Sequence, residues 1–194
     1  VPCPFIKPFA QDDLLHPEYL EICLKHFENN PQVNLVSARR NWIDENGDDA
    51  TGTYKSPFGA DLDLFKNIDG QGGSVEGKLV VAKCLEEIIN FIGEPTCVLY
   101  RSSNFRVEDS FRFDENFQHL GDLDLWLRVI HQGNMVFEDR TLCSFRRHRG
   151  SATYRNLDSF AIAPDLMLLF KKISTFYEEP TRMKKAFLGR ALPL

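Results

Sequence analysis

The chain has 194 residues, of which 43% are apolar and 26% charged, and its net charge at pH 7 is -5. This composition is typical of a globular domain and excludes a disordered chain. The negative charge disfavours binding to nucleic acid, and no apolar run reaches the ~20 residues of a membrane span. Five scattered cysteines without a C-x-x-C pair predict neither disulfides nor a zinc site, which favours a reducing, cytoplasmic compartment.

The spacing of apolar residues predicts strands and helices in alternation. Residues 5–10 are apolar but interrupted by prolines, which suits an edge strand. Residues 20–27 place apolar side chains on one face of a helix, and residues 33–43 alternate as a strand does. The pair Asn46 and Gly47 predicts a tight, hairpin-like reversal after that strand.

The second half of the chain continues the same alternation. Residues 69–77 are rich in glycine and predict a loop, and the stripe over residues 81–92 predicts a helix that ends at Gly93. The remaining predicted elements are a strand at 96–100, a helix at 122–132, two short strands at 135–138 and 142–146, and a largely helical region over the last forty residues. This order indicates an α/β layered fold.

Asp12 and Asp13 stand directly after the first apolar run, and three readings of this pair are open. The carboxylates can favour the positive end of a following helix, by roughly 0.3 to 1 kcal/mol each. They can instead present oxygens to Mg²⁺ or Mn²⁺, leaving positions on the ion for substrate phosphates. The third reading is a solvated turn.

Two further segments can carry chemistry. Asp122 stands at the start of a predicted helix, where it can cap the helix or act as a general base, and the spacing leaves both open. In the basic run FRRHRGS, the four residues Arg146, Arg147, His148 and Arg149 can bind a diphosphate and His148 can bind a metal, with a solvated basic turn as the alternative. Basic and apolar residues interleave over residues 181–190, which predicts a packed terminal helix or, as an alternative, a membrane-surface helix.

Five segments together resemble the family-2 glycosyltransferases of the GT-A fold. In chain order they are FAQDDLLHPEYL, VNLVSARRNWIDENGD, GEPTCVLYR, FDENFQHLGDLDLWLRVIHQGN and LCSFRRHRGSAT, and they span residues 5 to about 153. The resemblance implies an α/β, GT-A-like mixed sheet flanked by helices. Family members begin with a Rossmann-like βαβ half, so we expect this chain to be a fragment without it. The implied division is an acceptor-side, catalytic part at 1–155 and a C-terminal helical extension at 156–194.

The same resemblance implies roles for individual residues. Asp13 and His148 would bind a divalent cation, Mg²⁺ or Mn²⁺, while Asp12, Arg147 and His148 would bind a nucleotide-sugar donor such as a UDP-sugar. Asp122 would be the catalytic base. These roles require Asp13 and Asp122 to face one groove.

The implied activity is inverting, metal-dependent transfer of a sugar from a nucleotide-sugar to a hydroxyl group of a glycan or lipid-linked acceptor. Bacterial polysaccharide assembly, in the cytoplasm or at the inner face of the membrane, is the implied setting. Thr96 and Arg101 would belong to a strand that lines the acceptor side. The alternative is a non-catalytic glycan-binding or assembly module, and whether this chain alone is active stays open. Exposed sheet edges in such a fragment would favour a homo-oligomer.

Overall fold

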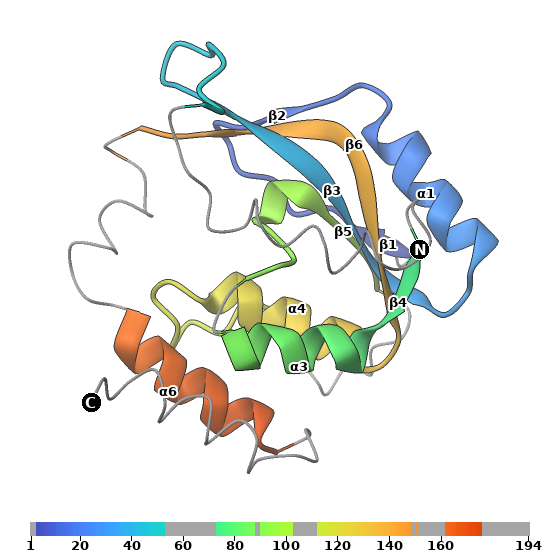
Figure 1. Ribbon diagram of the computed structural model, residues 1–194, viewed down its shortest axis with the longest axis vertical. Coiled ribbons are helices and arrows are strands. Elements are labelled where there is room, and N and C mark those ends of the chain that lie inside the picture. The colour runs from blue at the N-terminus through green and yellow to red at the C-terminus, as the bar shows by residue number, and fades with distance from the viewer. Residues whose placement is uncertain are drawn as a thin grey trace.

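The computed structural model describes residues 3–52, 73–87, 90–102, 112–148, 150 and 162–175. These residues form a mixed α/β fold with a curled, six-stranded sheet flanked by helices (Figure 1). The strand order is β1-β5-β3-β6-β2, and β4 pairs with β6. The strands are β1 (Phe5–Ile6), β2 (Leu14–Leu15), β3 (Val33–Ile43), β4 (Ser74–Glu76), β5 (Val98–Arg101) and β6 (Asn134–Arg146).

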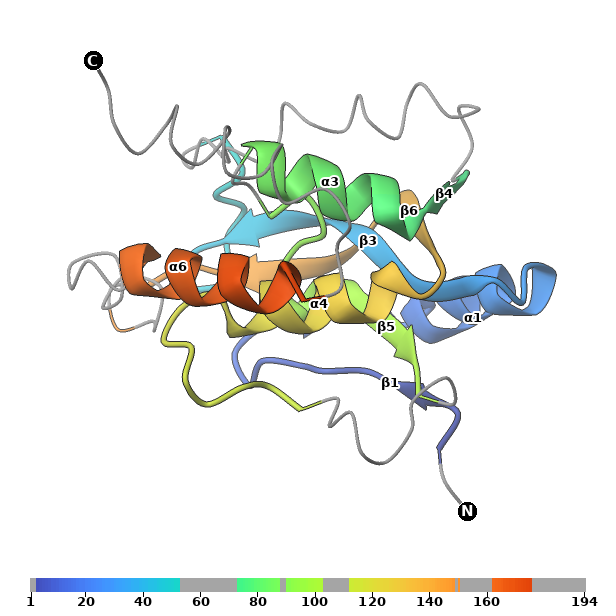
Figure 2. The same ribbon diagram turned by 90° about the horizontal axis from the view of Figure 1, so that it is seen from below.

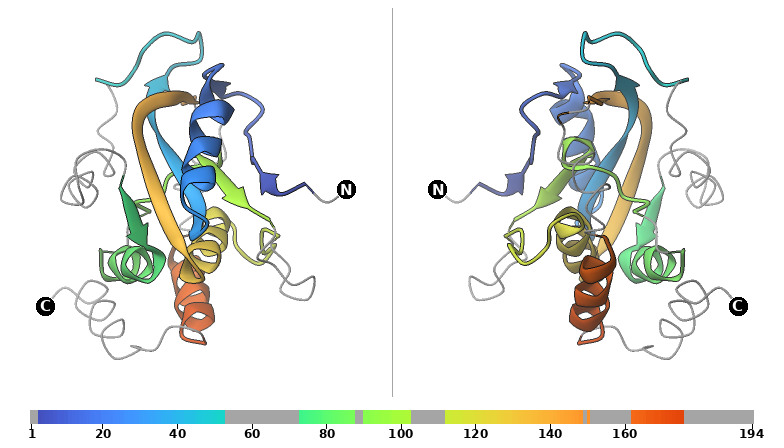
Figure 3. Two further views of the ribbon diagram at one scale, coloured as in Figure 1. Left: turned by 90° about the vertical axis from the view of Figure 1, so that its right-hand side faces the viewer. Right: turned by 90° about the vertical axis from the view of Figure 1, so that its left-hand side faces the viewer.

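The described helices cover both faces of the sheet. They are α1 (Tyr19–Asn29), α3 (Gly77–Glu87), α4 (Gly121–His131) and α6 (Ile162–Ile173), with a short 3-10 helix, η1 (Pro95–Cys97). Helix α1 packs on one face, whereas α3, α4 and α6 gather on the other (Figures 1 and 3). Within the described part of the chain, no helix combines the length and the apolar character that crossing a bilayer requires.

The alternation of side chains along β3 explains why the protein has two cores. Neighbouring residues of a strand point to opposite faces of the sheet. Leu35 accordingly packs into the larger core with Trp126 of α4, while Val36 packs into the smaller core with Phe27 of α1. Helix α6 joins the larger core through Leu169, which is almost fully buried. Figure 2 shows α6 running beside α4 on this face.

Strand β6 is one strand of 13 residues, where the sequence predicts two short strands. Its pairing with β3 is parallel, and the register shifts after Ala38, which faces Glu138, so that Arg39 faces Thr141. The exposed residues Asp139 and Arg140 lie in this irregularity. The polar residues that suggested an end to the strand therefore mark a β-bulge.

Several predicted boundaries are confirmed and others are wrong. Strand β3 and helix α4 lie where the sequence predicts them, and Asp49 pairs with Ile43 across the predicted reversal. The predicted loop at 69–77 instead contains β4, because those three residues add an antiparallel strand to β6. Helix α3 is described only as far as residue 87, and residues 90–93 are not helical, with Gly93 at φ 109°. The basic segment at 181–190 lies outside the described residues.

Candidate functional site

The candidate site lies at the carboxyl ends of the parallel strands β3 and β6. Parallel strands end at the same edge of a sheet, and ligands of open α/β sheets bind at that edge. Here Arg40 and Trp42 come from the end of β3, and Arg147 and His148 follow directly after β6. The turn that carries Asp12 reaches the same edge, since it precedes β2, which pairs with β6.

Asp12 and His148 are in direct contact. The Nε2 atom of His148 lies 3.0 Å from Oδ2 of Asp12, and both side chains stay about one-third exposed. The Arg146 side chain holds the turn in place. Its Nε donates to the carbonyl of Asp12 at 2.7 Å, and its Nη1 donates to the carbonyl of Asp44 at 2.8 Å. An exposed carboxylate and an imidazole are therefore held side by side.

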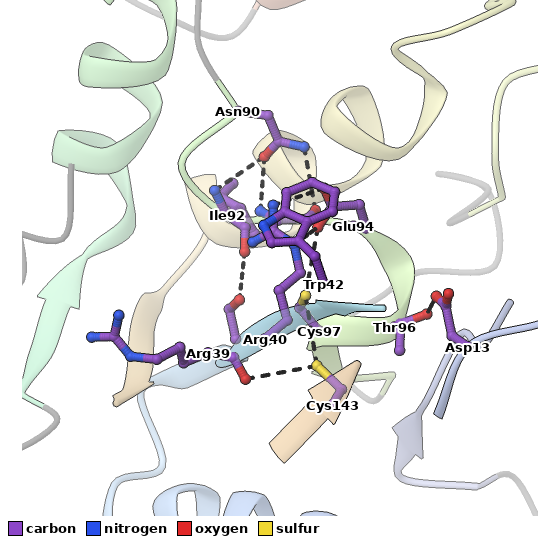
Figure 4. A network of polar contacts seen from close by, with 12 residues as sticks. Asp13, Arg39, Arg40, Trp42, Asn90, Ile92, Glu94, Thr96, Cys97 and Cys143 are labelled. Carbon is purple, nitrogen blue, oxygen red and sulfur yellow. Dashed lines mark hydrogen bonds and ion pairs between the residues drawn. The ribbon is translucent and has the colours of Figure 1, made fainter. Parts of the chain in front are cut away.

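Asp13 points into the protein, away from its neighbour Asp12. Its side chain is buried, Oδ1 accepts a hydrogen bond from the amide of Arg146 at 2.8 Å, and Oδ2 accepts one from the Thr96 hydroxyl (Figure 4). Burial raises the pKa of Asp13, and the carboxylates of Asp12 and Glu94 raise it further. The cation-binding role of Asp13 stays a prediction, and both of its oxygens already serve the fold.

The donor atoms at Asp12 and His148 fit a cation that is shared with a substrate. Among the residues that the structure describes, no group of three or more His, Cys, Asp or Glu is placed to hold a metal ion. Mg²⁺ in phosphate-binding sites needs only one or two carboxylates, because waters and substrate phosphates complete its shell. One carboxylate and one imidazole therefore suit a divalent ion that arrives with a diphosphate.

Glu94 pairs with Arg40 at the sheet edge and also acts electrostatically on Asp13. Its carboxylate pairs with Arg40 through contacts of 2.6 Å to Nε and 2.8 Å to Nη2 (Figure 4). The guanidinium of Arg40 lies 4.7 Å from the ring centroid of Trp42, and that of Arg147 lies 5.0 Å from the same ring. Both guanidinium groups therefore lie within cation–π distance of the Trp42 indole, a favourable arrangement that orients both arginines at the sheet edge.

Asp122 is the second residue of α4, and its Oδ1 accepts a hydrogen bond from the amide of Leu123 at 2.7 Å. Burial raises the pKa of Asp122 to about 7, and the Glu94 carboxylate adds to this shift. Glu94 thus acts on both Asp13 and Asp122. A carboxylate with a pKa near neutrality is suited to accept a proton at physiological pH.

Lys7, which no sequence motif indicates, links the segment after β1 to η1. The Lys7 ammonium donates hydrogen bonds to the carbonyls of Pro8, Pro95 and Thr96, at 2.7, 3.1 and 2.7 Å. Burial lowers the pKa of Lys7 to about 8. The indole nitrogen of Trp126 also donates to the carbonyl of Gly93 at 3.1 Å. These contacts join the end of β1, η1 and α4, and nothing in the local sequence signals them.

Arg101 lies away from the site. Its Nε donates to the carbonyl of Val33 at 3.3 Å, and its guanidinium lies 5.3 and 5.2 Å from the rings of Phe5 and Phe27. Val33 begins β3, so Arg101 sits at the opposite end of that strand from Trp42. The cation is occupied by aromatic packing and by a carbonyl, a structural arrangement.

Comparison of the chain with models of known protein families and with curated protein sequences finds no significant match. Three features of the described residues bear on function: the contact between Asp12 and His148, the arginines beside Trp42, and the carboxyl of Asp122 with its pKa near 7.

Proposed function

We propose that the protein is an inverting, metal-dependent glycosyltransferase with a GT-A-like sheet, acting on a nucleotide-sugar and on a hydroxyl group of a glycan or lipid-linked acceptor. The observation that carries the proposal is that Glu94 pairs with Arg40 of the basic sheet edge and also raises the pKa of Asp122. A cationic edge with a carboxylate and an imidazole suits the binding of a diphosphate, and the raised pKa of Asp122 suits a group that accepts a proton.

The proposed reaction is a single displacement at the anomeric carbon of the sugar. The Asp122 carboxylate accepts the proton of the acceptor hydroxyl as its oxygen forms a bond to that carbon. The bond from the carbon to the diphosphate breaks, and the nucleoside diphosphate leaves with the electron pair. Attack from the side opposite the leaving group inverts the configuration.

The basic edge of the sheet supports the leaving group in this proposal. Arg147 and His148 would donate charge-assisted hydrogen bonds to the diphosphate, and the contact with Trp42 limits the conformations that Arg147 can adopt. Asp12 and His148 are the residues that would hold Mg²⁺ or Mn²⁺. Such an ion supplies charge neutralisation on the departing phosphates.

Calorimetric titration of the protein with UDP, with and without Mn²⁺, tests the donor half of the proposal. We expect binding that requires Mn²⁺ and that weakens at least about tenfold in Asp12→Asn and in His148→Ala, since each removes a candidate ligand. His16→Ala is the matched control, because the side chain of His16 is exposed and contacts Glu18, two positions away. In the full-length protein, binding of UDP that is indifferent to Mn²⁺, or no binding, contradicts the proposal.

A second experiment separates transfer from the alternative of a non-catalytic glycan-binding or assembly module. Asp122→Asn keeps the shape of the side chain but cannot accept a proton, so turnover of a UDP-sugar should fall about 10²- to 10⁴-fold while UDP affinity stays unchanged. A glycan-binding module would instead bind oligosaccharides without UDP or Mn²⁺ and would show no turnover that Asp122→Asn could remove.

A further inference from the structure

Asp165 of α6 binds three consecutive backbone amides at the approach to α4. Its carboxylate accepts hydrogen bonds from the amide of Gln118 at 3.1 Å, from that of His119 at 2.6 Å and from that of Leu120 at 2.8 Å. The side chain is only 2% exposed. A buried carboxylate with several amide donors is among the stronger polar anchors in proteins.

Lys172, two helical turns after Asp165, makes a second anchor from the same helix. Its ammonium lies 2.8 Å from Oδ2 of Asp114 and 3.0 Å from the carboxylate of Asp124, and it lies 5.2 Å from the ring centroid of Phe117. Asp124 is fully buried and also pairs with Arg128 at 2.6 Å. A buried carboxylate needs such partners, so α6 and α4 are joined by charge as well as by packing.

The residue at the N-cap position of α4 makes no side-chain cap, so the backbone there depends on hydrogen bonds to α6. This residue is Leu120. Asp122, two positions later, is the residue that we propose as the base. The backbone that leads into Asp122 is therefore held by a carboxylate supplied from a helix more than forty positions further along the chain.

We propose that α6 is a positioning element for the base, with Asp165 and Lys172 as its positioning residues. This inference rests on the proposed glycosyl transfer, because it concerns where Asp122 meets the acceptor hydroxyl. A displacement of about 1 Å at a reacting group lowers a rate by up to about 10²-fold. Loosening either anchor therefore lowers kcat, while the KM for the donor, which depends on Asp12, Arg147 and His148 at the sheet edge, stays nearly constant.

The test compares Asp165→Asn and Lys172→Met with Lys171→Met, an exposed lysine one position away in the same helix. We expect kcat to fall about 10- to 100-fold in the first two variants, with donor KM changed less than about twofold, and no effect of Lys171→Met. Amide hydrogen exchange gives a readout without activity: exchange at residues 118–120 should become at least about tenfold faster in Asp165→Asn, with β3 and β6 unchanged.

The outcomes separate this inference from the proposed function. Full-length wild-type protein without transferase activity would overturn both. Active wild-type protein with an unaltered kcat in Asp165→Asn and Lys172→Met would overturn the positioning role alone, and so would a loss of kcat that is matched by an equal rise in donor KM. If Asp165→Asn does not fold, Lys172→Met carries the same kinetic comparison, because Asp124 keeps its contact with Arg128.

Discussion

The backbone amide of Arg146 donates a hydrogen bond of 2.8 Å to Oδ1 of Asp13, although 133 positions separate the two residues. Two positions further on, His148 contacts the other member of the acidic pair, Asp12. One strand end therefore fixes both carboxylates and turns them in different directions. The inward carboxylate holds the turn in place, and the outward one is available to a ligand.

The different surroundings of the two carboxylates predict that removing Asp13 destabilises the fold much more than removing Asp12. Asp13→Ala leaves the amide of Arg146 and the hydroxyl of Thr96 without their acceptors in a buried place, so we expect a loss of about 2–4 kcal/mol in the free energy of unfolding. Asp12→Ala affects an exposed side chain and should change that energy by less than about 0.5 kcal/mol. Urea denaturation checks both values, and equal losses would argue against this prediction.

The raised pKa of Asp122 predicts the pH dependence of activity and of stability. If Asp122 is the base, kcat should rise with pH and level off above about pH 7, the folded-state pKa. In the folded protein the proton is held up to this pH, whereas the unfolded carboxyl loses it near pH 3.8. The contribution of Asp122 to stability is therefore present below pH 3.8 and is lost as pH rises to about 7. Asp122→Asn should remove that decline in denaturation experiments across this range.

Glu94 offers a way to move the pKa of Asp122 without touching it. Glu94→Gln removes the charge that raises this pKa, so the acid limb of the kcat profile should move to lower pH, while the amide oxygen can still accept from Arg40. Glu76→Gln in β4 is the control, since Glu76 is exposed and lies on the strand beyond β6. A profile that does not move in Glu94→Gln would show that Glu94 and Asp122 are electrostatically independent.

The lowered pKa of Glu138, a residue outside the proposed site, predicts that the fold loses stability in acid. Although burial acts in the opposite direction, hydrogen bonds from Arg140 and His26 lower the pKa of Glu138 from 4.5 to about 2. Its contribution to stability is present above pH 4.5 and is lost as pH falls to about 2. Glu138→Gln should lower the free energy of unfolding at pH 7 by about 1.5–3 kcal/mol and flatten this acid transition. The exposed Glu21, paired with Lys25, should show a much smaller effect in Glu21→Gln.

Two glycines should respond differently to the same substitution. A Cβ atom at Gly77, the first residue of α3, would lie 1.7 Å from the carbonyl oxygen of Ile130 and 2.4 Å from that of Gly133. Gly77→Ala must therefore separate α3 from α4, at a cost of at least about 2 kcal/mol. At Gly52 a Cβ atom meets nothing within 4 Å in the part of the chain that the structure describes, so Gly52→Ala should be nearly neutral. Thermal unfolding of the two variants provides the comparison.

The elements predicted correctly are those whose own residues show a regular pattern of apolar and polar side chains. Strand β3 has a regular alternation and α4 has a stripe of apolar residues that ends at a glycine, so both were predicted within a residue or two. Strand β2 has only two residues, Leu14 and Leu15, and such a length carries no periodicity. It exists because its backbone pairs with Cys143 and Ser144, and no local pattern contains that partner.

The candidate site was predictable only where its residues belong to a short local motif. Asp12, His148 and Asp122 are titratable residues in such motifs, so the sequence alone identifies them as candidates. Asp165 looks like an ordinary acidic residue in the first turn of a helix, and its three amide partners lie 45 to 47 positions earlier. Partners at such separations are set by packing, which a single sequence does not display.

The contact between Asp165 and Leu120 has a consequence for the order of events during synthesis. A nascent chain leaves the ribosome amino end first, so α4 emerges while the residue that secures its start has still to be translated. Until about 45 more residues appear, the amides before α4 must be satisfied by water. In ribosomes stalled at increasing chain lengths, we therefore expect the region around Asp122 to become resistant to a protease later than the rest of the sheet and its flanking helices. This resistance should appear only when α6 has left the exit tunnel.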